Sequence, residues 1–190
     1  MKQTKQIYIV AGANGSGKTT ISKELLKEEK LEFLNADEIA YQINPTNIDK
    51  VKLSAGKIFF KKFKAYIKAE SSFIIESTLS GKYLQKYISI LKSNHYKITM
   101  LYIFLDNWNI ANFRVKERVK LGGHFISEED VKRRFFRSQK NFWNKYRLLV
   151  DEWSFIYNGD DFIDVAKGIE NNYTVLNEIR FEKFLNEVND

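Results

Sequence analysis

Residues 12–19 read Gly-Ala-Asn-Gly-Ser-Gly-Lys-Thr, and they follow directly on the apolar run Ile7-Tyr8-Ile9-Val10-Ala11. This is the G-x-x-x-x-G-K-[ST] pattern in the setting that makes it specific, a buried strand that leads through a glycine loop into a helix. Glycine permits positive φ, so that successive backbone N–H groups can converge on one anion, and the start of the helix adds the positive end of its dipole. The stretch predicts a phosphate-binding loop for a nucleoside triphosphate.

The side chains of this loop have separate predicted tasks. Lys18 can bring a positive charge to the β- and γ-phosphates, and the hydroxyl of Thr19 can ligate Mg²⁺. The predicted cofactors are therefore ATP and Mg²⁺. The residues expected to bind them are Gly12, Ala13, Asn14, Gly15, Ser16, Gly17, Lys18, Thr19 and Thr20, with Thr19 as the metal ligand.

Composition limits the class of protein. A chain of 190 residues with 44% hydrophobic and 15% aromatic residues is large enough for one folded domain, and we expect residues 1–190 to form it. Cysteine is absent, which excludes disulfides and thiolate metal sites. No apolar stretch has membrane-spanning length, and the N-terminal residues lack the profile of a signal peptide. These features predict a cytoplasmic protein without a membrane partner.

The formal net charge of +7 raises the question of a nucleic-acid partner. The densest group of lysines is Lys57, Lys61, Lys64 and Lys68, spaced three or four apart beside an apolar face that holds Phe59 and Phe63. This pattern is typical of an amphipathic helix with a solvated outer side. We therefore favour a solvated face and expect no nucleic-acid partner.

Apolar runs alternate with helical patterns along most of the chain. Strands are predicted at residues 6–11, 32–34, 72–75, 98–105 and 153–157, and helices at 18–28, 48–69, 82–93 and 108–121. Such alternation predicts an α/β protein of the three-layer P-loop kinase type, with a mainly parallel sheet. A capping box at residues 127–130 predicts a further helix as far as about 149. A last strand at 162–165 and a terminal helix over about 174–188 complete the prediction.

Acidic residues follow three of the predicted strands. They are Asp37, Glu76 and Asp106. In open sheets of this type ligands bind at the C-terminal ends of the strands, where a γ-phosphate, its metal ion and an acceptor hydroxyl would meet. Polar neighbours of these carboxylates, Asn35 and Thr78, are candidate substrate-binding residues together with Glu76.

Each carboxylate has two interpretations. Asp37 is our candidate general base, since phosphoryl transfer to an alcohol needs a carboxylate beside the attacking hydroxyl, but it could also cap a short helix. Glu76 would hold the acceptor or the water shell of the metal, or it lies in a surface turn. Asp106 has the position of a Walker B aspartate, although capping of the following helix explains it equally well.

A group of arginines surrounds the pair Gly122-Gly123. Arg114 and Arg118 lie four residues apart on one helical face before it, and Arg134 and Arg137 follow it. Residues 114–137 are therefore a candidate lid, whose arginines would neutralise charge during phosphoryl transfer. The alternative is a helical hairpin in which the arginines pair with Glu117, Glu128 and Glu129. We expect at least one of Arg118, Arg134 and Arg137 to reach a phosphate and to act in catalysis beside Lys18 and Asp37.

Taken together, these segments resemble the zeta-toxin family of P-loop kinases, in particular its short stand-alone branch. The matching pieces are AGANGSGKTT (11–20), NADEIA (35–40), LSAGK (53–57), ESTLSG (76–81), RVKERVKLGGHFISEEDVKRR (114–134) and the W-x-x-x-Y-N segment (153–158). They occur in the order of the family and cover most of the chain.

The resemblance implies a cytoplasmic kinase that uses ATP and Mg²⁺ to phosphorylate a hydroxyl of a UDP-activated amino sugar, restrained by an antitoxin protein. It carries the catalytic base onto Asp37, the acceptor-binding carboxylate onto Glu76 with Thr78 beside it, and the phosphate-binding arginines onto Arg118 and Arg134. The alternatives are a P-loop ATPase and a nucleoside or nucleic-acid kinase without a toxin role. Asn107 follows Asp106 where a mechanical ATPase would need a glutamate.

Overall fold

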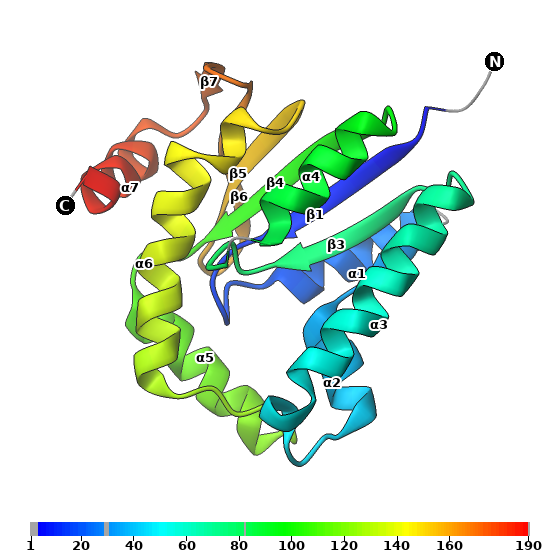
Figure 1. Ribbon diagram of the computed structural model, residues 1–190. Coiled ribbons are helices and arrows are strands. Elements are labelled where there is room, and N and C mark those ends of the chain that lie inside the picture. The colour runs from blue at the N-terminus through cyan, green and yellow to red at the C-terminus, as the bar shows by residue number, and fades with distance from the viewer. Residues whose placement is uncertain (1–3, 29–30, 82, 190) are drawn as a thin grey trace.

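The computed structural model describes residues 4–28, 31–81 and 83–189. Its sheet has seven strands in the order β2-β3-β1-β4-β5-β6-β7 (Figure 1). The strands are β1 (Gln6–Ala11), β2 (Glu32–Leu34), β3 (Phe73–Ser77), β4 (Lys97–Phe104), β5 (Glu152–Asn158), β6 (Phe162–Ile169) and β7 (Asn172–Val175). All pairings from β2 to β5 are parallel, and β5–β6 and β6–β7 are antiparallel. The predicted α/β class and mainly parallel sheet are confirmed.

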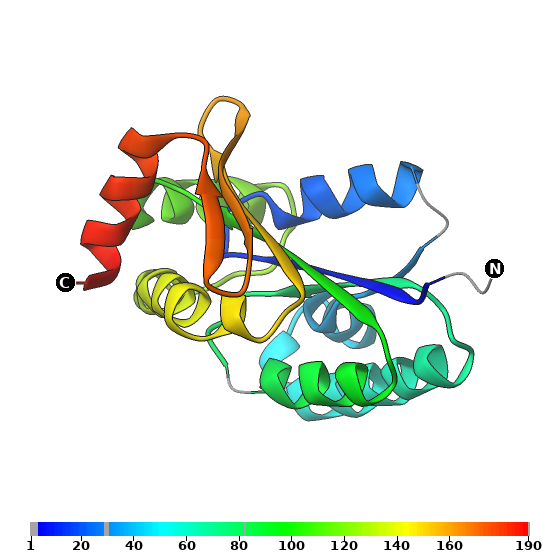
Figure 2. The same ribbon diagram turned by 90° about the horizontal axis from the view of Figure 1, so that it is seen from above.

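Helices cover both faces of this sheet (Figure 2). They are α1 (Lys18–Glu28), α2 (Ala36–Ile43), α3 (Ile48–Lys68), α4 (Tyr83–Ser93), α5 (Trp108–Lys120), α6 (Glu128–Asn144) and α7 (Glu178–Asn189). Leu25 and Leu26 of α1 pack on one face, against Val10, while residues of α3, α4, α6 and α7 pack on the other face in the main core. The result is the three-layer arrangement that the alternation predicts. Residue 82, the predicted first residue of α4, lies outside the described residues.

The central strand β1 carries the phosphate loop at its C-terminal end. Ile7, Ile9 and Val10 are fully buried, as expected for a parallel strand covered on both faces. Because β3 and β4 flank β1, the residues after β1, β3 and β4 meet at one edge of the sheet. This edge holds the site described below.

The C-terminal half differs from the prediction in two places. The helix expected over about 174–188 begins only at Glu178, because residues 172–175 form β7, which pairs with β6. The helix expected to reach about 149 ends at Asn144 and is followed by a 3₁₀ turn, Tyr146–Leu148. The Tyr146 hydroxyl in this turn donates to the carbonyl of Gly81, 3.1 Å away, and so joins the turn to the loop that follows β3.

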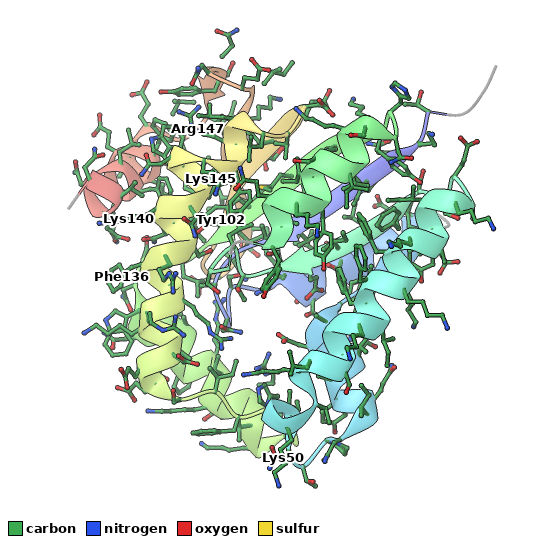
Figure 3. The ribbon with its side chains drawn as sticks, in the orientation of Figure 1. Lys50, Tyr102, Phe136, Lys140, Lys145 and Arg147 are labelled. Atoms are coloured by element: carbon green, nitrogen blue, oxygen red, sulfur yellow. The ribbon has the colours of Figure 1, made fainter. Side chains whose placement is uncertain are left out.

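An aromatic cluster fixes the C-terminal half of α6 on the sheet. The rings of Tyr102 in β4 and Phe142 in α6 are stacked, with centroids 4.1 Å apart, and the buried Tyr102 hydroxyl lies 3.1 Å from the hydroxyl of Ser138. Figure 3 labels Tyr102 beside α6. Phe184 of α7 packs against both rings.

No helix in the described part of the chain is long and apolar enough to cross a membrane.

Candidate active site

The phosphate loop lies between β1 and α1 and packs against the C-terminal ends of β3 and β4. Gly12 has a φ of +145°, and a Cβ there would collide with the carbonyl oxygen of Ile103 in β4. The N–H of Gly12 donates to the carbonyl of Ser77, 3.1 Å away, which ties the loop to the end of β3. Sequence and structure therefore agree on a loop whose backbone can approach phosphates closely.

Lys18 is the charged centre of the site. Its Nζ donates to the carbonyl oxygen of Ala13, 2.7 Å away, within the loop. Burial lowers the pKa of Lys18 to about 8, and the charges of Glu76 and Asp37 oppose this shift while those of Arg118 and Arg134 add to it. All four predicted charged residues thus lie within electrostatic range of one ammonium group.

A chain of hydrogen bonds connects the metal-ligand candidate to the ends of β2 and β3. The Thr19 hydroxyl donates to Oε2 of Glu76 at 3.2 Å, and Nδ2 of Asn35 donates to the same oxygen at 2.9 Å. Burial raises the pKa of Glu76, and the charge of Lys18 opposes part of that rise. The other carboxylate oxygen, Oε1, is buried and makes no hydrogen bond of ordinary length, and the nearby Ser22 hydroxyl also opposes part of the rise in the pKa of Glu76. Glu76 therefore belongs to the phosphate site, and its interpretation as a surface turn is wrong.

These residues fit a Mg²⁺ ion. A hydroxyl and a carboxylate with an unpaired buried oxygen are the hard oxygen ligands that Mg²⁺ prefers, and this ion usually takes only one or two protein ligands besides phosphates and water. Among the described residues, no group of three His, Cys, Asp or Glu forms a complete metal site. The arrangement suits a metal that arrives with a nucleotide.

Asp37 lies in the first turn of α2 and is exposed. Asn35 is the N-cap of this helix, because its Oδ1 accepts hydrogen bonds from the N–H groups of Asp37 and Glu38, at 2.8 and 3.2 Å. The alternative role of Asp37 as the cap is therefore wrong, and its carboxylate is available to a substrate. Asn35 thereby links Asp37 to Glu76.

Of the arginines in the candidate lid, Arg134 of α6 reaches the phosphate loop, whereas Arg118 of α5 contacts the segment between the two helices. Nη1 of Arg134 lies 3.5 Å from Oδ1 of Asn14 in the loop, and its Nη2 donates to Asp130 at 3.1 Å. Nη2 of Arg118 donates to the carbonyl of His124 at 3.3 Å. In the alternative hairpin the arginines would pair with Glu117 and Glu128, but these glutamates pair with lysines. These lysines are Lys120 and Lys116.

Asp106 does not cap α5, and its contacts are with β5 and α7. Asn107, not Asp106, caps α5. Asp106 accepts a hydrogen bond from the Tyr157 hydroxyl at 2.7 Å and pairs with Arg180 and Lys183 of α7. Burial alone would raise the pKa of Asp106, but these partners hold it below its usual value. The residue thus joins the C-terminal helix to the sheet.

A cavity of about 660 Å³ opens beside the carboxylates. Asp37, Glu76, Thr78 and Arg134 line it. Residues of α3 and α4 line it as well, with aromatic rings and two lysines. These wall residues, which sequence reasoning did not select as site residues, are Lys52, Lys57, Phe60, Tyr83 and Tyr87. Their spacing is that of ordinary amphipathic helices, so that only the folded chain identifies them.

The loop after β3 is held by α6. Leu79 is buried and has a φ of +53°, unusual for a side chain with a Cβ, and Asn141 of α6 donates to its carbonyl at 2.6 Å. The hydroxyls of Thr78 and Ser80 lie 2.8 Å apart at the cavity. Asn141 is thus a further residue that shapes the candidate site and that local sequence patterns do not reveal.

Comparison with known proteins agrees with this geometry. A model of the zeta toxin family matches residues 1–167. The chain belongs to the zeta toxin family. As a member of it, the chain is a nucleotide-binding P-loop phosphotransferase that acts on an alcohol group.

Two sequence relatives and two solved structures resemble this zeta toxin family member. An uncharacterized protein of Haemophilus influenzae is 37% identical over 133 residues, which are 70% of this chain and 94% of that protein. A shikimate kinase of Francisella tularensis subsp. novicida is 32% identical over 105 residues, covering 53% of this chain and 59% of the enzyme.

The structures share the fold. AvrRxo1-ORF1:AvrRxo1-ORF2 with sulphate ions gives a TM-score of 0.75 at 15% identity, covering 95% of this chain and 63% of that one, so that this chain spans less than two thirds of its neighbour. A structure of the PezAT chromosomal toxin–antitoxin system of Streptococcus pneumoniae gives 0.67 at 15% identity, covering 100% and 89%.

Proposed function

We propose that this zeta toxin family member is an ATP- and Mg²⁺-dependent kinase that phosphorylates a hydroxyl of a UDP-activated amino sugar, similar to UDP-N-acetylglucosamine. The observation that carries the proposal is that Asp37 and Glu76 line a cavity and also lie within electrostatic range of Lys18 in the phosphate loop. Donor and acceptor would meet at this point.

The proposed transfer assigns one task to each group. Asp37 accepts the proton of the acceptor hydroxyl as its oxygen bonds to the γ-phosphorus, and the bond from that phosphorus to the β,γ-bridging oxygen breaks to release ADP. Lys18, Arg118 and Arg134 neutralise the charge on the transferred phosphoryl group. A bound Mg²⁺, held by Thr19 and through the Glu76 carboxylate, would add further positive charge.

The size and lining of the cavity support a nucleotide-sugar acceptor. A volume of about 660 Å³ lies within the usual range for ligand pockets. Lys52 and Lys57 provide cations that suit a diphosphate, and the rings of Phe60, Tyr83 and Tyr87 provide surfaces on which a base can stack. The same cavity therefore offers carboxylates for the acceptor hydroxyl and cations for the diphosphate.

A shorter acceptor is the second candidate. The similarity to shikimate kinases favours a small carboxylated alcohol, for which the same lysines would bind the carboxylate.

We further propose that residues 1–190 act as one kinase domain, that residues 114–137 act as its lid, and that a protein antitoxin restrains the enzyme. The toxin–antitoxin system named for one structural neighbour supports the last point.

The acceptor is tested by incubating the protein with ATP, Mg²⁺ and a panel of UDP-sugars, shikimate, nucleosides and oligonucleotides, followed by mass spectrometry of the products. We expect a phosphorylated UDP-amino sugar. A phosphorylated oligonucleotide, or ATP hydrolysis with no phosphorylated acceptor, would contradict the proposal. Expression of the wild type beside Lys18→Ala in bacteria tests toxicity.

The base is tested with Asp37→Asn. We expect transfer to fall by about 10²- to 10⁴-fold, the usual contribution of general base catalysis, with ADP affinity within about twofold of the wild type. Glu38→Gln is the matched control, because Glu38 is a second exposed carboxylate in the same turn of α2. Normal transfer by Asp37→Asn would exclude Asp37 as the base.

A further inference from the structure

The last segment of the family resemblance, W-x-x-x-Y-N, ends in a residue that contacts the phosphate loop. Asn158 is the final residue of β5, and its Nδ2 donates to the carbonyl oxygen of Ser16 at 2.8 Å. Ser16 is fully buried. A side chain 142 residues further along the chain therefore fixes one peptide of the loop.

The contact is close as well as polar. Gly17 has a φ of +98°, and a Cβ at this position would collide with Nδ2 of Asn158 and lie 3.3 Å from the ring of Phe162. The turn between β5 and β6 thus packs directly on the loop. The φ favours glycine at residue 17, and a larger residue there would also have to displace the Asn158 amide.

The turn that carries Asn158 is itself held from two sides. Nη2 of Arg114 in α5 donates to the carbonyl of Gly159 at 2.9 Å. The preceding residue, Tyr157, donates its hydroxyl to Asp106, and the guanidinium of Arg180 stacks 3.5 Å above its ring. Asn158 therefore projects from a turn held on both sides, and such a turn can define the position of the loop.

We propose that Asn158 is a positioning residue for the nucleotide phosphates, acting through the peptide between Ser16 and Gly17. A trans peptide is planar, so its C=O and N–H point in opposite directions. When Asn158 holds the Ser16 carbonyl toward the turn, the N–H of Gly17 is directed to the opposite side, into the concave loop where phosphate oxygens bind. The proposal rests on the nucleotide binding that is part of the proposed function.

The test compares Asn158→Leu with Asn94→Leu. Leucine has nearly the shape of asparagine but cannot donate, and it adds no charge near the phosphates. Asn94 is the matched control, because its Nδ2 also donates to a backbone carbonyl, that of Ile90, at 2.8 Å, just after the end of α4. The affinities for ADP and for inorganic tripolyphosphate are measured by calorimetry in the presence of Mg²⁺.

We expect Asn158→Leu to weaken both ADP and tripolyphosphate at least tenfold and by the same factor, with Asn94→Leu within twofold of the wild type. Wild-type affinity in Asn158→Leu would overturn the proposal. So would equal losses in both variants, which indicate a general structural effect, or a loss for ADP alone, which indicates contact with the base. If Asn158→Leu does not fold, Asn158→Ala carries the same expectation and the same refutations.

This test is independent of the acceptor. A wild-type protein that binds ADP but phosphorylates no UDP-sugar would contradict the proposed function and leave the role of Asn158 intact. Conversely, unchanged ADP affinity in the Asn158 variants would remove the positioning role while the kinase assignment remains.

Discussion

Lys18 combines a buried position with a charge that phosphate binding requires. In the free protein, burial lowers its pKa to about 8, although Glu76 and Asp37 favour the charged form. A bound polyphosphate would stabilise the ammonium and raise this pKa again. Nucleotide binding and protonation of Lys18 are therefore coupled, and the coupling has a definite sign.

We expect nucleotide affinity to fall as pH rises above about 8, with a limit of tenfold per pH unit, because the neutral amine must take up a proton on binding. Calorimetry at pH 9 in buffers of different ionisation enthalpy measures this proton uptake. Lys18→Ala is expected to bind nucleotide more weakly and to lose this dependence of affinity on pH.

The same pKa affects folding in the absence of nucleotide. Between pH 8 and 10.5 the Lys18 side chain binds more protons in the unfolded protein than in the folded protein, so its contribution to the free energy of unfolding rises with pH in that window.

The carboxylate of Glu76 gives a second prediction at the residue scale. Its hydrogen bond with Thr19 and its unpaired Oε1 place it where a metal ion would be held. We expect Glu76→Gln to weaken ADP binding about tenfold with Mg²⁺ present and by less than twofold in EDTA, because the amide keeps the shape but loses the charge. Equal weakening under both conditions would show that Glu76 acts on the loop rather than on the metal.

At the scale of elements, α6 belongs to two different parts of the molecule. Its C-terminal half, with Phe142, is part of the main core, whereas Val131 and Phe135 pack with α5 in a smaller cluster that also contains Ala13 of the phosphate loop. The cluster joins the candidate lid to the nucleotide site, and the main core anchors the other end of the helix.

This division predicts different local stabilities along one helix. We expect the backbone amides of residues 128–134 to exchange with solvent faster than those of residues 138–144, because fewer buried side chains hold the N-terminal half. ADP with Mg²⁺ is expected to slow exchange mainly in the first half, through Arg134. Hydrogen exchange followed by mass spectrometry measures both effects, and uniform exchange along α6 would contradict a mobile lid.

At the scale of the whole molecule, one sheet connects all the elements of the site. The phosphate loop, the acceptor cavity and the turn at Asn158 follow β1, β3 and β5, and β4 lies between β1 and β5. Displacement of one of these strands would therefore move both the phosphate loop and the cavity. This continuity supports a single folding unit.

We expect one cooperative unfolding transition in urea, with the same midpoint by fluorescence and by circular dichroism. ADP at about 100 times its dissociation constant should raise the free energy of unfolding by about 2.7 kcal/mol, since the ligand binds only the folded state. Lys18→Ala at the same ADP concentration serves as the control and should gain less. Two separate transitions would contradict the single-domain proposal.

Local signals predicted much of the site. The loop at 12–19, the position of Asp37 after β2 and that of Glu76 at the end of β3 all follow from short patterns, because glycine φ preferences, apolar runs and strand ends are properties of neighbouring residues. The terminal helix was misplaced because the sequence after residue 171 forms a strand only when β6 is beside it.

The sequence by itself determined the three-layer fold, the phosphate loop and the two carboxylates at the strand ends, since each follows from patterns among neighbouring residues. Tertiary structure alone decided that Asp106 pairs with α7, that Asn141 holds Leu79, and that Asn158 reaches Ser16. These are single polar contacts between residues 62 to 142 positions apart, and no local pattern specifies them. They arise only when hydrophobic burial has already brought the strands and helices together.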